Sequence, residues 1–269
     1  MEAFLSYGFL QRALLAGIFV AVACALLGVF LILRRDAMIG HGLAHVAFAG
    51  VALGILLKVM PLLAALAVAV LTALGIMKIK EKAGLYGDTA IAIFSSVGFA
   101  LGLLFVTFAH RFNVDLFSYL FGEILAIEAR EVWLSVGLAV VVVLIVVINY
   151  HQFMYMTFDR ESAKVAGIKV NRLDVVLTML TAITVVLAMK IVGLILVAAL
   201  VVIPAAAGLQ LAANFKQAIV ISSLVSVASV VFGLFLAFYI DLPASATIVI
   251  LAFLIFALFF FIKRGKRLS

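Results

Sequence analysis

Long apolar runs separated by short polar or basic segments dominate this chain. A helix needs about 20 apolar residues to cross the hydrocarbon core of a bilayer. Nine runs approach that length, which predicts a polytopic, all-α membrane bundle of about nine transmembrane helices. They cover residues 13–33, 39–58, 62–77, 88–108, 131–150, 173–189, 191–212, 218–239 and 244–262. The shorter runs are expected to be tilted or partly re-entrant.

Composition supports this class. The chain is 68% hydrophobic and 12% charged, whereas soluble domains are about half apolar and about a quarter charged. Because the runs recur along the whole length, residues 1–269 are expected to form a single transmembrane domain. The first run lacks a small-residue cleavage site and is expected to be a retained span. The single cysteine, Cys24, offers neither a disulfide nor a multi-cysteine metal site within one chain.

The net charge of +7 comes from basic residues at the ends of the apolar runs, not along one amphipathic face. The positive-inside rule explains this better than nucleic-acid binding does, and we expect no nucleic-acid partner. With the N-terminus outside, the inner connections hold 14 of the 19 basic residues. The other five are Arg12, Lys58, Arg111, Arg130 and Lys190. The distribution predicts an external N-terminus and a cytoplasmic C-terminus.

Two connections contain most of the remaining polar residues. The inner one, residues 157–174, has mixed charge and a glycine, which predicts a short helix that ends at Gly167 and docks a soluble partner. The residues expected to make that contact are Arg160, Glu161, Lys164 and Gly167. The outer one, residues 110–123, is half aromatic and half polar, as is typical of an interfacial segment. Its polar residues, His110, Asp115 and Glu123, are either ordinary boundary residues or ligands that catch an incoming ion.

His41 and His45 are four residues apart near the start of an apolar run. Residues at this spacing share one face of a helix, so both imidazoles can reach one metal ion. Ionisable residues within a membrane usually face the bundle interior or a transport pathway. The alternatives are an interior imidazole that binds a backbone carbonyl for His45, and a solvated side chain near the boundary for His41.

Three other features predict local structure. Pro204 lies within a span, where it should kink the helix and free a carbonyl, and so it is a candidate gate residue. Asp241 precedes Pro243 and is expected to cap the last span, or else to lie at the outer mouth of the pathway. Two pairs of glycines lie four residues apart, Gly50 with Gly54 and Gly98 with Gly102. They predict close helix packing within one subunit, in preference to a dimer contact.

The sequence contains no Gly-x-x-x-x-Gly-Lys-Ser/Thr loop; the nearest string, at Gly265, lies in the basic C-terminal tail. It also shows no Ser/His/Asp arrangement and no haem-attachment motif. We therefore expect no enzymatic activity and no cofactor in this chain. A transporter, a channel or a structural membrane subunit remain as classes.

Four stretches, residues 33–54, 113–126, 188–207 and 239–249, carry a family resemblance. Taken together they resemble the permease subunits of bacterial ABC importers for zinc, manganese and iron. The second stretch, Asn-Val-Asp-Leu-Phe-Ser-Tyr-Leu-Phe-Gly-Glu-Ile-Leu-Ala, looks like the zinc branch in particular.

The resemblance implies a homodimer in the cytoplasmic membrane, with two cytoplasmic ATPase subunits and an extracytoplasmic binding protein that delivers the metal. It implies the fold of the type II importers, typified by the cobalamin permease, with one N-terminal span fewer. Residues 159–172 then match the loop whose coupling helix contacts the ATPase.

One departure concerns the cargo. Where this chain has His41, the family usually has an aspartate, so a carboxylate–imidazole pair becomes an imidazole pair. Imidazole favours zinc, nickel or copper over manganese, so zinc is the expected cargo, with manganese and iron as the alternatives. One pair leaves the ion under-ligated, and a second subunit related by a two-fold axis would supply another pair.

Two other functions compete with an ATP-driven permease: a secondary transporter or channel without ATPases, and a scaffold subunit that transports nothing. A secondary transporter usually shows internal repeats. The C-terminal half holds no convincing repeat of the His41 segment.

Overall fold

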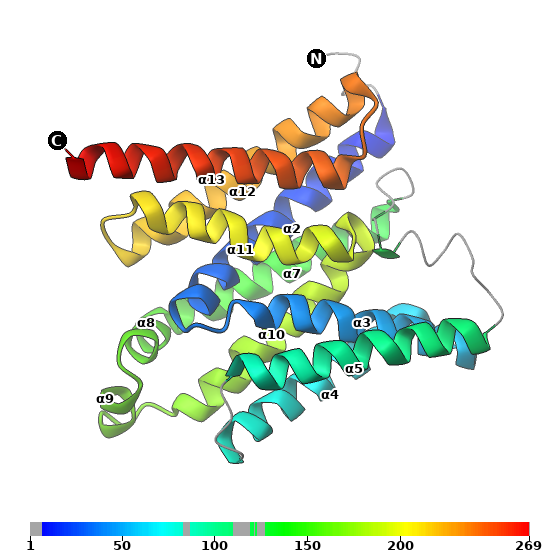
Figure 1. The fold of residues 1–269 in the computed structure, drawn as a ribbon, viewed down its shortest axis with the longest axis horizontal. Coiled ribbons are helices and arrows are strands. Elements are labelled where there is room, and N and C mark those ends of the chain that lie inside the picture. The colour runs from blue at the N-terminus through cyan, green and yellow to red at the C-terminus, as the bar shows by residue number, and fades with distance from the viewer. Residues whose placement is uncertain (1–6, 83–86, 110–118, 121, 123–126, 269) are drawn as a thin grey trace.

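The computed structural model describes residues 7–82, 87–109, 119, 120, 122 and 127–268 (Figure 1). These residues form a bundle of helices, and no strand occurs in the described part of the chain. The helices are α2 (Gly8–Leu33), α3 (Met38–Leu57), α4 (Pro61–Lys82), α5 (Gly87–Phe108), α7 (Ala129–Ile148), α8 (Tyr150–Phe158), α9 (Arg160–Val165), α10 (Val170–Val192), α11 (Leu194–Leu211), α12 (Phe215–Ile240) and α13 (Ala244–Leu268).

The predicted all-α membrane bundle is confirmed. Eight of the described helices are long and apolar enough to cross a membrane. The remaining predicted segment, residues 191–212, corresponds to α11, which at 18 residues is the shortest of the long helices. Most helix ends fall within a few residues of the predicted ends. The α4 and α13 helices extend further because lysine, glutamate and arginine continue a helix well beyond an apolar core.

The helices differ in how much of their surface other helices cover. In the apolar, membrane-spanning part of α2, α3 and α10, between 67% and 72% is buried inside the bundle, whereas in that part of α13 the buried share is 11%. The α2 helix packs against α7, α10, α11 and α12, which explains why small residues line so much of it. The α13, α4 and α5 helices lie at the periphery, where their exposed apolar side chains suit contact with lipid.

The glycine pairs pack helices of the same chain, as predicted. A Cβ on Gly50 would lie 2.5 Å from the Ala65 Cα, and a Cβ on Gly54 would lie 2.7 Å from the Pro61 Cα, both in α4. Gly102 approaches Phe48 in the same way from α5. The glycines therefore hold α3 against α4 on one side and α5 on the other.

Gly28 makes the closest helix contact of this kind, between α2 and α11. A Cβ at this position would lie 1.8 Å from the Val201 carbonyl oxygen. We expect Gly28→Ala to force the two backbones apart and to cost about 1–3 kcal/mol of stability or more. Thermal unfolding of the protein in detergent measures this. Gly137→Ala is the matched control, because nothing lies within 4 Å of a Cβ there; equal melting temperatures for the two variants would contradict the packing.

The predicted role of Asp241 as the cap of the last span is wrong. Asp241 has φ +56° and closes the C-terminal end of α12, where its N–H donates to the Ala237 carbonyl. Asparagine and aspartate tolerate this left-handed conformation better than most residues. Pro243 then separates it from α13, which begins at Ala244.

The two ends of the bundle differ in content. One end, called here the α9 end, carries α8, α9, the turn between α2 and α3, and the C-terminus (Figure 1). The opposite end, called here the loop end, carries the start of α2, the α12–α13 turn, the end of α5 and the start of α7.

Candidate functional site

His41 and His45 lie in the first turns of α3, and the structure brings their imidazoles together. Their Nε2 atoms are 3.1 Å apart, and the ring planes are nearly perpendicular at 81°. One Nε2–H therefore donates to the lone pair of the other Nε2. Two nitrogen ligands at about 2.0–2.1 Å from a tetrahedral ion stand about 3.3 Å apart. The pair needs little movement to chelate one ion through both Nε2 atoms, once the shared proton leaves.

The two imidazoles have different surroundings. His41 is exposed on the surface of the chain, whereas His45 is half-buried against Phe99 of α5, with ring centroids 5.1 Å apart. Gly98 allows this contact because it lets α5 approach α3 closely at Val46. The Nδ1 of His45 is buried without a hydrogen-bond partner. Packing, and not a hydrogen bond to Nδ1, therefore orients this ring.

The pair offers two ligands of the four that a tetrahedral ion takes. Among the described residues, no group of three or more histidine, cysteine, aspartate or glutamate side chains gathers at one point. The three predicted outer residues, His110, Asp115 and Glu123, lie outside the described residues. A third or fourth ligand to an ion at His41 would have to come from water, from those segments or from another molecule.

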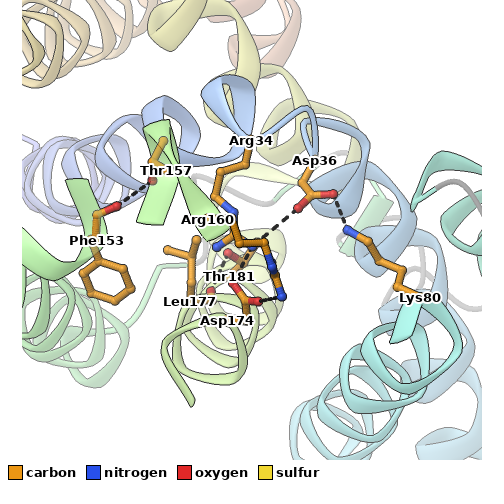
Figure 2. A network of polar contacts seen from close by, with 9 residues as sticks. All are labelled: Arg34, Asp36, Lys80, Phe153, Thr157, Arg160, Asp174, Leu177 and Thr181. Atoms are coloured by element: carbon orange, nitrogen blue, oxygen red, sulfur yellow. Dashed lines mark hydrogen bonds and ion pairs between the residues drawn. The ribbon is translucent and has the colours of Figure 1, made fainter. Parts of the chain in front are cut away.

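A second polar cluster lies at the α9 end. The Asp174 carboxylate, in the first turns of α10, binds Arg34 at 2.5 Å and Arg160 at 2.6 Å. Asp36 binds Lys80 of α4 at 2.5 Å and lies 3.8 Å from Arg34. Figure 2 shows the two arginines converging on Asp174, with Asp36 between Arg34 and Lys80. We call these five residues the ion network.

The two carboxylates of the ion network are buried, whereas Arg160 and Lys80 are partly exposed. Asp36 and Asp174 are 7% and 5% exposed, and buried carboxylates of this kind are tolerated only when cations pair with them. Three cations face two carboxylates, and a cleft of about 50 Å³ opens among them. In the sequence, Arg34 and Lys80 are two of the basic residues in the inner connections and indicate only orientation. The missed signal for the network was an acidic residue at the edge of each of two apolar runs.

An ion pair ties α10 to α7 at the loop end. Lys190 binds Glu131, which is 8% exposed and also accepts the Glu128 backbone N–H as part of a capping box. Lys190 had been expected only as an outer boundary charge. Ion pairs to a buried carboxylate therefore anchor both ends of α10.

The predicted short helix in residues 157–174 is confirmed as α9. Asp159 caps its start by accepting the Ser162 N–H at 2.9 Å and the Ser162 hydroxyl at 2.5 Å. These hydrogen bonds, the hydroxyl one above all, hold the pKa of the Asp159 carboxyl below its usual range. Gly167, at φ +81°, ends the helix, and the Ile168 N–H donates to the Ala163 carbonyl. The fold of this segment thus follows from its cap and its glycine.

Of the four residues predicted to contact a partner, Gly167 ends α9, and the other three divide into two groups. Glu161 and Lys164 form an exposed pair at 2.8 Å on the outer face of α9, where a docked protein can reach them. Arg160 is partly exposed but directs its guanidinium at Asp174. Arg160 therefore has a partner within the chain, which sequence reasoning did not anticipate.

Pro204 is buried within α11, and the helix continues through it. Its missing N–H leaves the carbonyl one turn earlier without its helical partner. A role for Pro204 in gating stays a prediction.

The sequence is similar to those of known membrane proteins. The ABC 3 transport family matches residues 6–263. The chain belongs to this family. It is 32% identical to the manganese transport system membrane protein MntC of Halalkalibacterium halodurans, over 98% of this chain and 94% of that one. It is also 35% identical to the zinc uptake membrane protein ZnuB of Haemophilus influenzae, over 64% of this chain and 66% of that one.

A solved structure extends the similarity to the fold. PsaBC from Streptococcus pneumoniae in complex with Fab has a chain that matches with a TM-score of 0.89 and 32% identity, over 99% of this chain and 97% of that one. Further relatives with manganese in their names match over nearly the full length. These relatives do not favour the zinc branch that the stretch 113–126 suggested.

The chain is thus a multi-pass membrane permease of a bacterial metal-ion ABC importer, as the four sequence stretches predicted. It is not itself an enzyme, because in this family a separate ATPase subunit hydrolyses ATP. The competing interpretation, a transporter that works without ATPases, is not favoured.

Proposed function

We propose that this permease carries a divalent transition metal ion into the cell past His41 and His45. The observation that supports this most strongly is the 3.1 Å approach of two Nε2 atoms on one face of α3. Both imidazoles lie in a region otherwise filled by apolar side chains. An ion that meets only two protein nitrogens is held briefly, and a transport pathway requires such weak binding.

A second copy of the chain completes the proposed pathway. His41 is exposed on the surface of the single chain, so a copy related by a two-fold axis can bring its own pair to the same ion. The N-terminus and the loop end face outward, where an extracytoplasmic binding protein delivers the metal. The α9 end faces the cytoplasm, where each copy docks one ATPase subunit. The basic residues of the inner connections support this orientation.

The cargo follows from two considerations that point in different directions. Most relatives are named for manganese, whereas imidazole ligands favour zinc over manganese. We propose that manganese and zinc both pass this permease and that the residue at position 41 sets their ratio.

The proposed partnership with an ATPase has a direct test. The tagged permease, purified from the membranes of its own cells, should bring an ATPase subunit with it. Reversing the exposed pair on α9, as Glu161→Lys with Lys164→Glu, should weaken that association, because both side chains lie on the proposed docking face. Recovery of the intact permease without any ATPase would contradict the proposal and favour a secondary transporter.

A carboxylate at position 41 should change the cargo. We expect His41→Asp to lower the ratio of zinc to manganese uptake by about fivefold or more, because a hard oxygen replaces a softer nitrogen. Competition between the two ions in an uptake assay measures the ratio. His151→Asp, on α8 and exposed, is the matched control and should leave it unchanged. An unaltered ratio in the His41 variant would show that this side chain does not contact the ion.

A further inference from the structure

The ion network joins the proposed docking helix to the helix that carries the histidines. We propose that the Arg160–Asp174–Arg34 bridge is a positioning device that transmits movement of α9 to the start of α3. The inference rests on the proposed function, because it assumes that an ATPase moves α9. Asp174 touches no transported ion in this account and acts through its two arginines.

The first step is the attachment of α9 to the bundle. This helix has six residues, and of these only Ala163 is buried. Within the part of the chain that the structure describes, the Arg160–Asp174 contact is the one ion pair that joins α9 to another helix. A small, exposed helix held in this way can move with a docked partner, and Arg160 moves with it.

The second step is the sharing of one carboxylate. The Asp174 Oδ2 binds Arg160 at 2.6 Å, and its Oδ1 binds Arg34 at 2.5 Å. The side chains of Asp174 and Arg34 are only 7% and 12% exposed. Water screens such a pair poorly, so displacement of Arg160 changes the field that Arg34 experiences.

The third step is the turn between α2 and α3. Arg34 and Asp36 flank Arg35, whose φ of +59° is unfavourable for a residue with a side chain. Ion pairs on both sides hold this turn in place. The Asp36 carbonyl accepts the Ile39 N–H at 3.0 Å, in the turn that leads directly into α3. His41 follows only two residues later.

These three steps form a continuous chain from α9 through α10 to α3, and Lys80 extends it into α4. The cleft of about 50 Å³ among the same side chains gives them room to exchange partners. A strained turn held by exchangeable ion pairs can adopt two discrete arrangements, as transmission between distant sites requires.

Arg160→Ala tests the bridge in the complete transporter, reconstituted in proteoliposomes with its ATPase subunit and binding protein. Removing this side chain should leave ATP hydrolysis within about twofold of the unmodified value while metal uptake per ATP falls by about fivefold or more. Arg160→Lys should retain much of the unmodified metal uptake per ATP, because an ammonium can still reach one Asp174 oxygen. Lys216→Ala is the control: it removes an exposed cation at the same end of the bundle and should leave the ratio unchanged.

A double variant examines whether the two residues act in series. Once Asp174→Asn has removed the bridge, adding Arg160→Ala should not lower metal uptake per ATP any further. Additive losses would overturn the inference. An unchanged ratio in Arg160→Ala would also overturn it, as would hydrolysis and uptake that fall together with loss of the bound ATPase. If the unmodified transporter itself shows no ATP-dependent uptake, the proposed function fails and not merely the bridge.

Discussion

Replacing His41 and His45 together by alanine is expected to lower ATP-dependent metal uptake by about a hundredfold or more. The pair supplies both nitrogens of the proposed pathway, and no third histidine, cysteine or acidic side chain joins it among the described residues. A passing ion would then meet only apolar surface at this depth. Uptake of a radioactive metal by cells that express each variant is the measurement.

The fold should survive this change. His41 is exposed, and His45 loses mainly its contact with Phe99, so little buried surface is lost. His151→Ala is the matched control, since it removes an exposed imidazole that lies outside α3. Equal amounts of protein in the membrane and an unchanged melting temperature would assign the loss to the ion. Normal uptake by the double variant would remove the histidines from the pathway.

The second large effect concerns stability. We expect Asp174→Ala to destabilise the bundle by about 3–5 kcal/mol, because it leaves Arg34 charged and largely buried with only the more distant Asp36 carboxylate, at 3.8 Å, to pair with it. Arg160 loses the same carboxylate but is 42% exposed, so water compensates it in part. Unfolding in detergent with increasing denaturant measures the difference. Asp88→Ala, which removes an exposed carboxylate near the start of α5, should change stability little.

A further variant separates the loss of charge pairing from the loss of packing. Arg34→Met together with Asp174→Leu replaces the buried pair by apolar side chains of similar size and should recover much of the stability. If Asp174→Ala unfolds no more easily than Asp88→Ala, the network does not stabilise the fold as the structure indicates.

The sequence predicted the features that depend on neighbouring residues. Apolar run length located the long helices, because each span must bury its own backbone polar groups in lipid. The end of the short helix α9 followed from local chemistry at Gly167, and the structure adds the cap at Asp159. The spacing of His41 and His45 placed both imidazoles on one helix face, and their approach confirms it.

The ion network was beyond sequence reasoning for a physical reason. Its residues come from the α2–α3 turn, α4, α9 and α10, and only tertiary packing decides which cation meets which carboxylate. Lys80 and Asp36 are 44 residues apart in the chain. For the same reason the sequence indicates only a boundary charge at Lys190, whereas the structure pairs it with Glu131. Asp241 was misassigned because its left-handed backbone cannot be inferred from a following proline.

The most direct test of the central claim is metal uptake into proteoliposomes that contain the permease with its ATPase subunit and binding protein. We predict that manganese and zinc accumulate inside only when ATP is supplied on the ATPase side, and that the variant lacking both His41 and His45 hydrolyses ATP without accumulating metal. Uptake that needs no ATP, or that persists without the two histidines, would contradict the account.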